Sequence, residues 1–296
     1  MKEFIVKEKY NENKIENIIK KEFPSLSSNS LNKLFRLKDI KVNEKRVQRE
    51  YIVHSGDNVK IFASDDILYG NTFKIDYIYE DDNILVAYKP KGIVSCNSDK
   101  SFESMVKKDK GNNITICHRL DTNTEGLLIF CKNIVVLDEL LSGFKNSNIH
   151  KEYLTLVYGN LKKKKDILKA FIVKDNKTAF SKVVDKEIKG GQNIITEYEV
   201  IKYFSKSNVS LLNIKLHTGR THQIRAHMKH IGHNVIGDSK YGINEINRKL
   251  KVKSQILVAY KYTFSFDKTS ILSYLNNITI ELPKEKINKI FKWLDI

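Results

Sequence analysis

Apolar residues near the start of the chain recur at helical spacing in two places. The first set precedes Pro24, which ends the helix because proline has no backbone N–H to donate: Ile15, Ile18, Ile19 and Phe23. Ser27 or Ser28 then suits the N-cap of a second helix, since a serine hydroxyl accepts from a free N–H of the first turn. The second helix carries its apolar residues on one face: Leu31, Leu34 and Phe35.

Short strand-like segments follow the two helices. A hairpin is predicted by Ile40-Lys41-Val42 and Lys45-Arg46-Val47 on either side of Asn43-Glu44. Gly56-Asp57 marks another turn before an alternating strand over residues 59–62. These patterns predict a small α/β domain over residues 1–64, and the polar residues 65–74 are expected to form a linker.

Residues 75–296 show more strand patterns than helix patterns. Runs rich in β-branched and aromatic residues predict strands over 84–88, 153–158, 198–203 and 209–216. Helical spacing predicts helices near 137–144 and 287–294. Strands in series, with helices inserted irregularly, favour an α+β fold with a mixed, largely antiparallel sheet and flanking helices over a doubly wound fold.

The composition adds a strong positive charge. The 296 residues include 52 Lys and Arg against 35 Asp and Glu, which gives a formal net charge of +17. Such a surplus favours a nucleic-acid partner, because neutralised phosphates release counterions and supply affinity without sequence preference. A chain-wide bias toward Lys, Asn and Ile is the simpler alternative explanation of the same charge.

Basic residues are crowded in the N-terminal domain. Those expected to contact RNA are Lys33, Arg36, Lys41, Lys45 and Arg46, although a solvated surface position is the alternative for each one. The strings L-S-S-N-S-L-N-K-L-F-R and I-K-V-N-E-K-R-V resemble the S-four RNA-binding domain, which is named after a protein of the small ribosomal subunit. The resemblance covers about residues 10–64 and implies that this domain binds RNA.

The sequence favours neither a membrane protein nor a protein stabilised by disulfides. No segment is long and apolar enough to cross a bilayer, and the charged start Met1-Lys2-Glu3-Phe4 does not resemble a signal peptide. The cysteines, Cys96, Cys117 and Cys131, are odd in number and lack C-x-x-C spacing, so neither a disulfide framework nor a thiolate zinc site is indicated. We therefore expect a cytoplasmic protein.

The candidate chemistry begins with residues 118–130, H-R-L-D-T-N-T-E-G-L-L-I-F. This segment places Asp121 beside Arg119 where an apolar strand begins. Burial raises the pKa of a carboxyl group and a nearby guanidinium lowers it, and a nucleophilic carboxylate requires the second effect to win. Arg119 or Arg220 is the expected source of that guanidinium. The alternative is that Asp121 only caps a turn, which is a common place for Asp.

Two other segments add polar and aromatic groups. G-R-T-H-Q-I-R at residues 219–225 is cationic, and Tyr153 begins a strand from which its ring packs in the core or faces a base. Five histidines between residues 217 and 233 suggest a metal site, but their spacing does not match a zinc pattern. We expect no metal there; donors to RNA phosphates or buried structural histidines explain the cluster better.

Four motifs, taken in order, resemble the RluA-type pseudouridine synthases: H-R-L-D-T-N-T-E-G-L-L-I-F, K-E-Y-L-T-L-V-Y-G, G-R-T-H-Q-I-R-A-H-M-K-H-I-G-H and V-I-G-D-S-K-Y-G. Residues 79–92 also resemble the first motif of that family, and the resemblance spans about residues 75–282. It implies isomerisation of uridine to pseudouridine in RNA with neither cofactor nor metal. The uridine must be extruded, because its glycosidic bond is unreachable inside a stacked helix.

The resemblance also implies roles for individual residues. Asp121 matches the catalytic aspartate, which attacks either the anomeric carbon of the ribose or carbon 6 of the uracil. Tyr153 matches the tyrosine that packs on the base and assists proton removal from carbon 5, and Arg220 matches the arginine paired with the aspartate. Arg119 matches the arginine that helps to hold the flipped nucleotide. The other expected substrate-binding residues are His118, Thr221, Gln223 and Leu257.

Two positions depart from the family pattern. Many relatives have Ser where Glu125 stands, and a Leu-His-Ala pattern of the family reads Leu257-Val258-Ala259 in this chain. We assign no part of the missing histidine's role to Val258. Leu257 still provides the apolar side chain expected in the wall of the site.

RNA is therefore the expected partner of a monomeric enzyme. Large-subunit ribosomal RNA is the first expectation for the substrate, and transfer RNA is the alternative. A non-catalytic RNA-binding or ribosome-assembly factor is the second hypothesis, and the presence of Asp121, Tyr153 and Arg220 argues against it. A metal-dependent nuclease that uses the histidines is the third.

Overall fold

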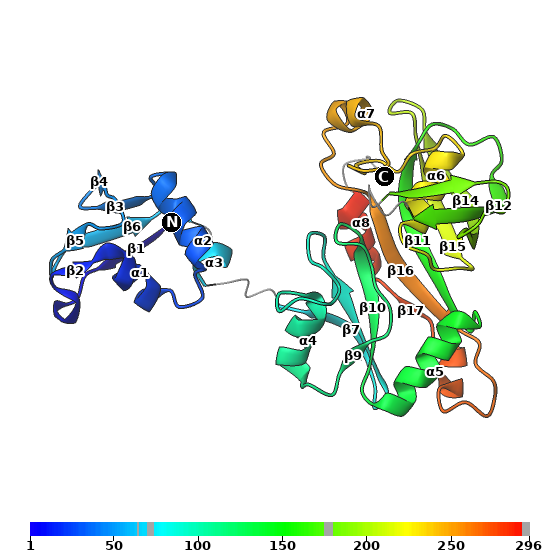
Figure 1. Cartoon of the computed structure of the whole chain (residues 1–296), viewed down its shortest axis with the longest axis horizontal. Helices are drawn as coiled ribbons and strands as arrows, with labels where there is room; N and C mark the ends of the chain where they lie inside the picture. The colour runs from blue at the N-terminus through cyan, green and yellow to red at the C-terminus, as the bar shows by residue number, and fades with distance from the viewer. Residues whose placement is uncertain (64, 70–73, 175–179, 292–296) are drawn as a thin grey trace. The chain divides into compact units, whose positions relative to one another are not determined.

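The computed structural model describes residues 1–63, 65–69, 74–174 and 180–291. The chain divides into two compact units, Met1–Lys74 and Ile75–Ile296, called here the N-terminal unit and the C-terminal unit (Figure 1). Each unit has its own core of buried apolar side chains. None of the helices that the structure describes has the length and apolar character required to cross a bilayer.

The N-terminal unit combines small sheets with short helices. Its sheet has the strand order β1-β6-β3-β4, built from Lys2–Ile5, Asn58–Ile61, Ile40–Val42 and Lys45–Arg46, and a second pair joins β2 (Asn13–Lys14) to β5 (Ile52–Val53). Helices α1 (Ile15–Glu22) and α2 (Ser28–Arg36) confirm the two predicted helices. Ser27 caps α2 by accepting the backbone N–H of Ser30, and β3 and β4 form the predicted hairpin.

The expected linker is partly folded. Residues 65–74 begin with a short helix, α3 (Asp65–Leu68), and Leu68 is fully buried in the core of the N-terminal unit. The expectation of a linker is therefore wrong at its start, because Leu68 is buried in the core and the ring of Tyr69 packs against Phe23, so these side chains anchor the helical turn. Residues 70–73 lie outside the described part of the chain.

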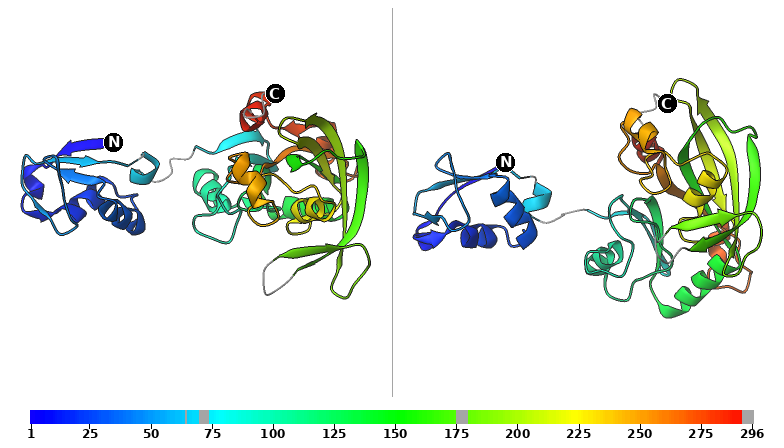
Figure 2. Two further views of the ribbon diagram at one scale, coloured as in Figure 1. Left: turned by 90° about the horizontal axis from the view of Figure 1, so that it is seen from above. Right: turned by 45° about the horizontal axis from the view of Figure 1, so that its top comes forward.

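One large sheet organises the C-terminal unit (Figure 2). Its strand order is β13-β12-β14-β15-β11-β16-β10-β8-β7, while β9 pairs with β10 and β17 pairs with β16. Among the described strands, β10 and β16 run parallel and the other neighbours run antiparallel, which confirms the mixed, largely antiparallel sheet. In chain order the strands are β7 Asp76–Glu80, β8 Ile84–Lys89, β9 Thr115–Ile116, β10 Glu125–Cys131, β11 Ile149–Tyr158, β12 Lys165–Lys174, β13 Ser181–Val184, β14 Gln192–Phe204, β15 Val209–Leu216, β16 Leu257–Phe264 and β17 Ile280–Glu281.

Among the described residues, five α-helices accompany this sheet: α4 (Phe102–Lys110), α5 (Ile134–Lys145), α6 (Gln223–His230), α7 (Asn244–Lys249) and α8 (Lys284–Phe291). The predicted helices near 137–144 and 287–294 correspond to α5 and α8, although residues 292–294 lie outside the described residues. Helix α6 follows β15 after a short loop and packs on β13 and β14. It thereby carries the segment 219–225 to the sheet.

The sequence patterns do not predict β12 or the edge strand β13. Beside the run Lys162–Lys165, β12 alternates exposed and partly buried residues at one end of the sheet, so its apolar signal is weak. The predicted bounds of β15 are confirmed. Most of its residues are buried, because it pairs with neighbours on both sides.

Candidate active site

A pocket in the C-terminal unit brings together most of the predicted site residues. It lies between the turn before β10, the middle of β11 and the segment that leads into α6. Six of the predicted residues line it: Arg119, Asp121, Tyr153, Arg220, Gln223 and Leu257. These residues come from four separate segments of the sequence, so the sheet and α6 together create the site.

Asp121 lies in a turn held by backbone contacts. The Asp121 carbonyl accepts the N–H of Thr124 at 3.0 Å, and the Thr122 carbonyl accepts from Gly92 N–H at 2.8 Å. The buried Lys89 ammonium also donates to the Thr122 carbonyl at 3.1 Å. The turn therefore closes through the backbone of Asp121, and its carboxylate points to other partners. This geometry argues against the alternative that Asp121 only caps the turn.

Lys89 is the buried cation beneath this turn. Its Nζ donates to the carbonyls of Pro90 and Ile93 at 2.9 Å each, in addition to that of Thr122. Burial lowers the pKa of Lys89 to about 8, and the charges of Glu125 and Asp121 act in the opposite direction. An ammonium with three carbonyl acceptors ties β8 to the turn that carries Asp121.

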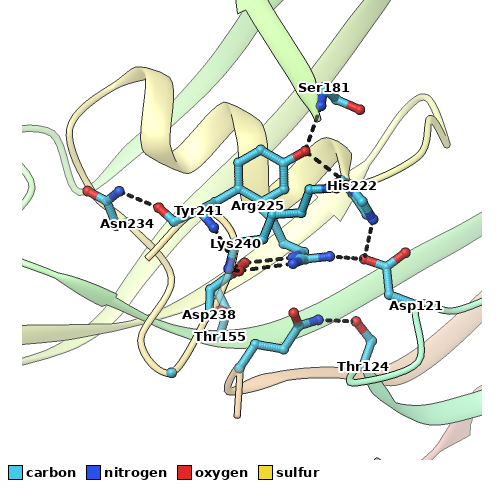
Figure 3. Close-up of polar contacts among 12 residues, drawn as sticks. Asp121, Thr124, Thr155, Ser181, His222, Arg225, Asn234, Asp238, Lys240 and Tyr241 are labelled. Carbon is cyan, nitrogen blue, oxygen red and sulfur yellow. Dashed lines mark hydrogen bonds and ion pairs between the residues drawn. The ribbon is translucent and has the colours of Figure 1, made fainter. Parts of the chain in front are cut away.

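The guanidinium that holds Asp121 belongs to Arg225. Its Nη1 donates to Asp121 Oδ2 at 2.7 Å, while Nε and Nη2 donate to Asp238 at 2.6 and 2.9 Å (Figure 3). The expectation that Arg220 is this partner is wrong: no described carboxylate lies within ion-pair distance of Arg220, and its side chain belongs to an exposed residue. Helix α6 begins at Gln223, so Arg225 lies in its first turn and Arg220 in the preceding loop.

Asp238 completes an ion-pair network behind the site. Burial raises the pKa of Asp238, but the bonds and charge of Arg225 outweigh this effect and keep the pKa below its usual value. Burial likewise opposes the charge of Arg225, and the carboxylates of Asp238 and Asp121 raise its pKa overall. A fully charged guanidinium thus joins two carboxylates, and only 8% of its side chain is exposed.

Tyr153 forms an aromatic wall of the pocket. It lies on β11, opposite Ile214 of β15 and Ala259 of β16, and is 6% exposed. Burial raises the pKa of the Tyr153 hydroxyl, and the charge of Asp121 raises it further. The hydroxyl is therefore protonated near neutral pH, and the ring is suited to contact a base.

Two predicted substrate-binding residues, His118 and Thr221, lie outside the pocket lining. His118 lies between the rings of Phe144 and Tyr262, and its Nε2 accepts the N–H of Ile129, so it does not line the pocket. Thr221 is exposed and outside the pocket lining. The motif positions of both predicted contact with the substrate. The strand and helix geometry turns His118 into the core instead.

Gln223 lines the pocket, but its amide is engaged within the protein. Oε1 accepts from the Arg220 N–H at 3.0 Å and from the Thr218 hydroxyl at 2.9 Å. Nε2 donates to the Ile195 carbonyl and the Thr196 hydroxyl at 3.1 and 3.0 Å. The amide has thus filled both of its donor positions, and we assign Gln223 to holding the loop before α6 rather than to hydrogen bonding with substrate.

The histidines of residues 217–233 have separate partners. His217 faces Glu197, His230 faces Asp185, and His233 Nδ1 lies 2.9 Å from the Tyr158 carbonyl. His227 is buried beside Thr196, and burial lowers its pKa to about 4. Within the described residues no group of three His, Cys, Asp or Glu side chains is placed to hold a metal ion.

His222 was missed as a site residue. It lines the pocket, its Nε2 lies 3.8 Å from Asp121 Oδ2, and its Nδ1 lies 3.0 Å from the Tyr241 hydroxyl (Figure 3). The motif G-R-T-H-Q-I-R marks the segment that contains His222, but the spacing of residues in a motif does not give the direction of a side chain in a loop. A left-handed backbone at His222, with φ of 58°, sets that direction.

The two departures from the family pattern are neighbours. Glu125 of β10 pairs in register with Val258 of β16. The Glu125 carboxylate accepts from the Tyr88 hydroxyl and forms an ion pair with Lys91 at 2.8 Å. Val258 is fully buried beside it. The carboxylate at position 125 thus has its own partners on the β8 side and is separate from Asp121.

The basic residues predicted to bind RNA lie on α2 and the β3–β4 hairpin. Lys33, Arg36, Lys45 and Arg46 are exposed, whereas Lys41 is half-buried, 3.7 Å from Glu44 and above the ring of Phe62. Exposure leaves four of the five cations accessible to phosphate.

Comparison with known proteins agrees with this geometry. Residues 83–230 match the family model described as RNA pseudouridylate synthase. An uncharacterized RNA pseudouridine synthase of Mycoplasma genitalium is 35% identical over an alignment of 237 residues that covers 75% of this chain and 73% of that protein. Ribosomal large subunit pseudouridine synthase C of Rickettsia bellii is 31% identical over an alignment of 254 residues that covers 79% of this chain and 84% of the relative. The solved structure of human RNA pseudouridylate synthase domain containing 1 has a TM-score of 0.63 at 20% identity, covering 76% of this chain and 89% of that one, and supports the fold.

Proposed function

The chain belongs to the RluA family of RNA pseudouridine synthases, and on that premise we propose that it modifies large-subunit ribosomal RNA with Asp121 as the nucleophile. The enzyme class, an isomerase that converts uridine to pseudouridine in RNA, follows from the family. The choice of RNA is supported by the name of the Rickettsia bellii relative.

The observation that carries the role of Asp121 is its carboxylate in a pocket, joined to Arg225 at 2.7 Å and adjacent to Tyr153. The Arg225 guanidinium fixes the position of the Asp121 carboxylate in the pocket, and a positioned carboxylate is a group able to act as a nucleophile. Arg225 is itself held by Asp238, so the pair is preorganised before the substrate enters.

The reaction requires little beyond these groups. Asp121 bonds transiently to the anomeric carbon or to carbon 6 of the uracil, the bond between uracil N1 and the ribose breaks, and the detached base turns. Carbon 5 then bonds to the anomeric carbon, the bond to Asp121 breaks, and the proton lost from carbon 5 is matched by one gained at N1. We assign to Tyr153 the contact with the base and to Leu257 an apolar wall of the same pocket. Arg119 is an exposed residue that also lines the pocket, and this position suits it to hold the extruded nucleotide.

We assign RNA binding to the exposed cations of the N-terminal unit as well. Four predicted RNA contacts on α2 and the β3–β4 hairpin are exposed, and the strings that carry them resemble an S-four domain. The C-terminal unit also contributes, since it contains 37 Lys and Arg against 24 Asp and Glu. Affinity without base contacts is expected from such a surplus.

Two variants, Asp121→Asn and Asp121→Ala, test the nucleophile. The substrate is total RNA from a strain that lacks the gene, labelled with tritium at carbon 5 of uracil, because isomerisation releases this tritium whichever RNA is the target. We expect release by the unaltered enzyme and none by either variant, while filter binding shows RNA affinity within about twofold, since a single carboxylate adds no phosphate contact.

Asp138→Asn on α5 is the matched control and should retain release, because Asp138 is exposed and outside the pocket lining. Release by Asp121→Ala would overturn the assignment of the nucleophile. A lack of release by the unaltered protein on every RNA would instead favour the non-catalytic RNA-binding factor. Pseudouridine mapping in the strain without the gene then distinguishes ribosomal from transfer RNA as the target.

A further inference from the structure

We propose that His222 is a positioning residue that, together with Arg225, engages Asp121 Oδ2 and leaves Oδ1 as the attacking oxygen. The inference rests on the proposed function of Asp121 as a nucleophile. It is carried by a chain of contacts from Ser181 through Tyr241 and His222 to Asp121 (Figure 3).

The tautomer of His222 follows from the hydrogen bonds of Tyr241. The backbone N–H of Ser181 donates to the Tyr241 hydroxyl at 2.7 Å, since an N–H group cannot accept. The hydroxyl has one proton and is buried, so this proton needs an acceptor, and His222 Nδ1 lies 3.0 Å away. A neutral imidazole that accepts at Nδ1 carries its proton on Nε2. The Nε2–H therefore faces Asp121.

The charge state of His222 agrees with this tautomer. Burial lowers the pKa of His222 by more than the carboxylate of Asp121 raises it, and the nearby cations Arg225 and Lys240 lower it as well. The ring is thus neutral near pH 7 and has one N–H to offer. The donor is neutral, so it can engage Oδ2 while Arg225 remains the counter-ion of Asp121.

Two chains of contacts begin in the loop that contains Asp238 and Tyr241, and both end at Asp121 Oδ2. Asp238 orients Arg225, whose Nη1 donates to Asp121 Oδ2 at 2.7 Å. Tyr241 orients His222, whose Nε2 lies 3.8 Å from that oxygen. The two chains of contacts are also joined to each other. The Tyr241 N–H donates to Asp238 Oδ1 at 2.9 Å, and the Arg225 guanidinium lies 5.1 Å from the centre of the Tyr241 ring.

The arrangement distinguishes the two oxygens of Asp121. Oδ2 has a guanidinium donor and the imidazole N–H on one side, whereas no donor among the described residues is within hydrogen-bond distance of Oδ1. Oδ1 therefore keeps its lone pairs for a carbon of the substrate. The 3.8 Å separation at Nε2 exceeds a hydrogen bond, and catalytic contacts commonly shorten to bonding distance once substrate is bound.

The backbone of His222 fixes the direction of its ring. Its φ of 58° lies in the left-handed region, which is uncommon for residues other than glycine. The residue immediately precedes α6 and has no side-chain capping bond to that helix. Helix capping therefore does not account for the strained conformation, but the placement of the ring between Tyr241 and Asp121 does.

A pair of amide substitutions separates the two ring nitrogens. His222→Gln puts an amide N–H near the position of Nε2, whereas His222→Asn puts an amide oxygen near Nδ1 and cannot reach Asp121. The assay is the single-turnover rate of tritium release from total RNA of the strain without the gene, at saturating enzyme. We expect His222→Asn to lower the rate by about 10- to 100-fold and His222→Gln by less than about fivefold, as for one hydrogen bond to a charged group.

A purely structural role predicts the reverse order. Asn keeps the bond to Tyr241 and tolerates the left-handed backbone better than Gln, so it would then be the milder substitution. Equal losses, or no loss in either variant, would also overturn the proposal. Thermal melting and filter binding accompany each rate, and both variants should bind RNA within about twofold of the unaltered enzyme because no phosphate contact changes.

A double-mutant cycle with Tyr241→Phe tests the tautomer and does not depend on the Asn variant folding. The hydroxyl acts through Nδ1, so Tyr241→Phe should slow release in the parent enzyme by about tenfold and have little effect in the His222→Gln background. An equal effect in both backgrounds would overturn the role of Tyr241. Asp121→Asn in the same assay separates the two failures: release by that variant refutes the proposed nucleophile, whereas loss of release with a reversed Gln and Asn order refutes the His222 proposal alone.

Discussion

Arg225 is the residue on which the geometry of the site depends. Its three donating nitrogens reach two carboxylates, Asp121 and Asp238, that come from segments more than a hundred residues apart. A planar guanidinium suits this task because its donors diverge in fixed directions, whereas the single ammonium of a lysine does not reproduce that fork. The buried Asp238 also depends on Arg225 for its charge.

Arg225→Lys should therefore reduce both activity and stability. We expect the rate of tritium release to fall about 10²- to 10³-fold, as for the loss of a preorganised electrostatic partner. Arg225→Ala should lower the free energy of unfolding by about 3–5 kcal/mol, because it leaves Asp238 buried without its ion-pair partner. Single-turnover assays and thermal melting measure the two effects.

Arg220→Lys is the matched control for Arg225→Lys. Its side chain lines the same pocket but is exposed and belongs to the loop before α6. The change should leave the melting temperature of the protein within experimental error. An unaltered rate and stability in Arg225→Lys, with a large loss in Arg220→Lys, would return the role of partner to Arg220.

At the scale of elements, the parallel contact of β10 with β16 brings the Asp121 turn next to β11. Gly126 of β10 lies opposite Ala259 of β16, and Tyr153 of β11 lies opposite Ala259 on its other side. The φ of Gly126 is 125°, and a Cβ added there would lie within 2.8 Å of the Ala259 carbonyl carbon and closer still to its oxygen. Only glycine allows the two backbones to approach this closely.

Gly126→Ala should consequently destabilise the C-terminal unit. The added methyl group meets backbone atoms that cannot move without breaking the sheet, so we expect a loss of about 3 kcal/mol or more in the free energy of unfolding. Calorimetry of the full chain should show a lower melting temperature for the transition of the C-terminal unit.

Gly232→Ala separates backbone strain from this clash. Gly232 has a φ of 82° with nothing within 4 Å of an added Cβ, so it should cost only about 1–2 kcal/mol for the left-handed backbone. Equal losses for the two substitutions would show that the close contact with β16 does not limit the fold.

For the whole molecule, the positive charge is distributed unevenly between the two units. The N-terminal unit has 15 Lys and Arg against 11 Asp and Glu, whereas the C-terminal unit has 37 against 24. Most of the surplus therefore belongs to the unit that contains the pocket. The N-terminal unit contributes a local group of cations on α2 and the β3–β4 hairpin rather than a large net charge.

A chain of residues 75–296 should therefore keep the chemistry and bind RNA more weakly. This unit has its own core and all the residues that line the pocket. We expect the single-turnover rate at saturating enzyme to persist and RNA affinity to fall by about tenfold. The slope of log K against log salt should decrease by about 0.7 to 0.9 for each phosphate that the shorter chain no longer neutralises. Filter binding across a salt series measures both binding changes.

Substitution of the four exposed cations in the full chain, Lys33, Arg36, Lys45 and Arg46, by glutamine provides the companion measurement. It should reproduce most of the loss in affinity without removing a domain, because these side chains are accessible to phosphate. Unchanged affinity in both proteins would remove the RNA-binding role of the N-terminal unit.

The sequence alone determined the local features of this protein. Periodicity predicted α1, α2, the β3–β4 hairpin and β15, because each depends on neighbours in the chain, and the ordered motifs identified the family. Tertiary structure decided which residues meet. The motif G-R-T-H-Q-I-R predicts Arg220 as the partner of Asp121 and gives no sign of the direction of His222. Only the start of α6 and the approach of β10 to β16 turn Arg225 and His222 toward Asp121. Side-chain direction depends on packing between distant segments, and no local pattern records it.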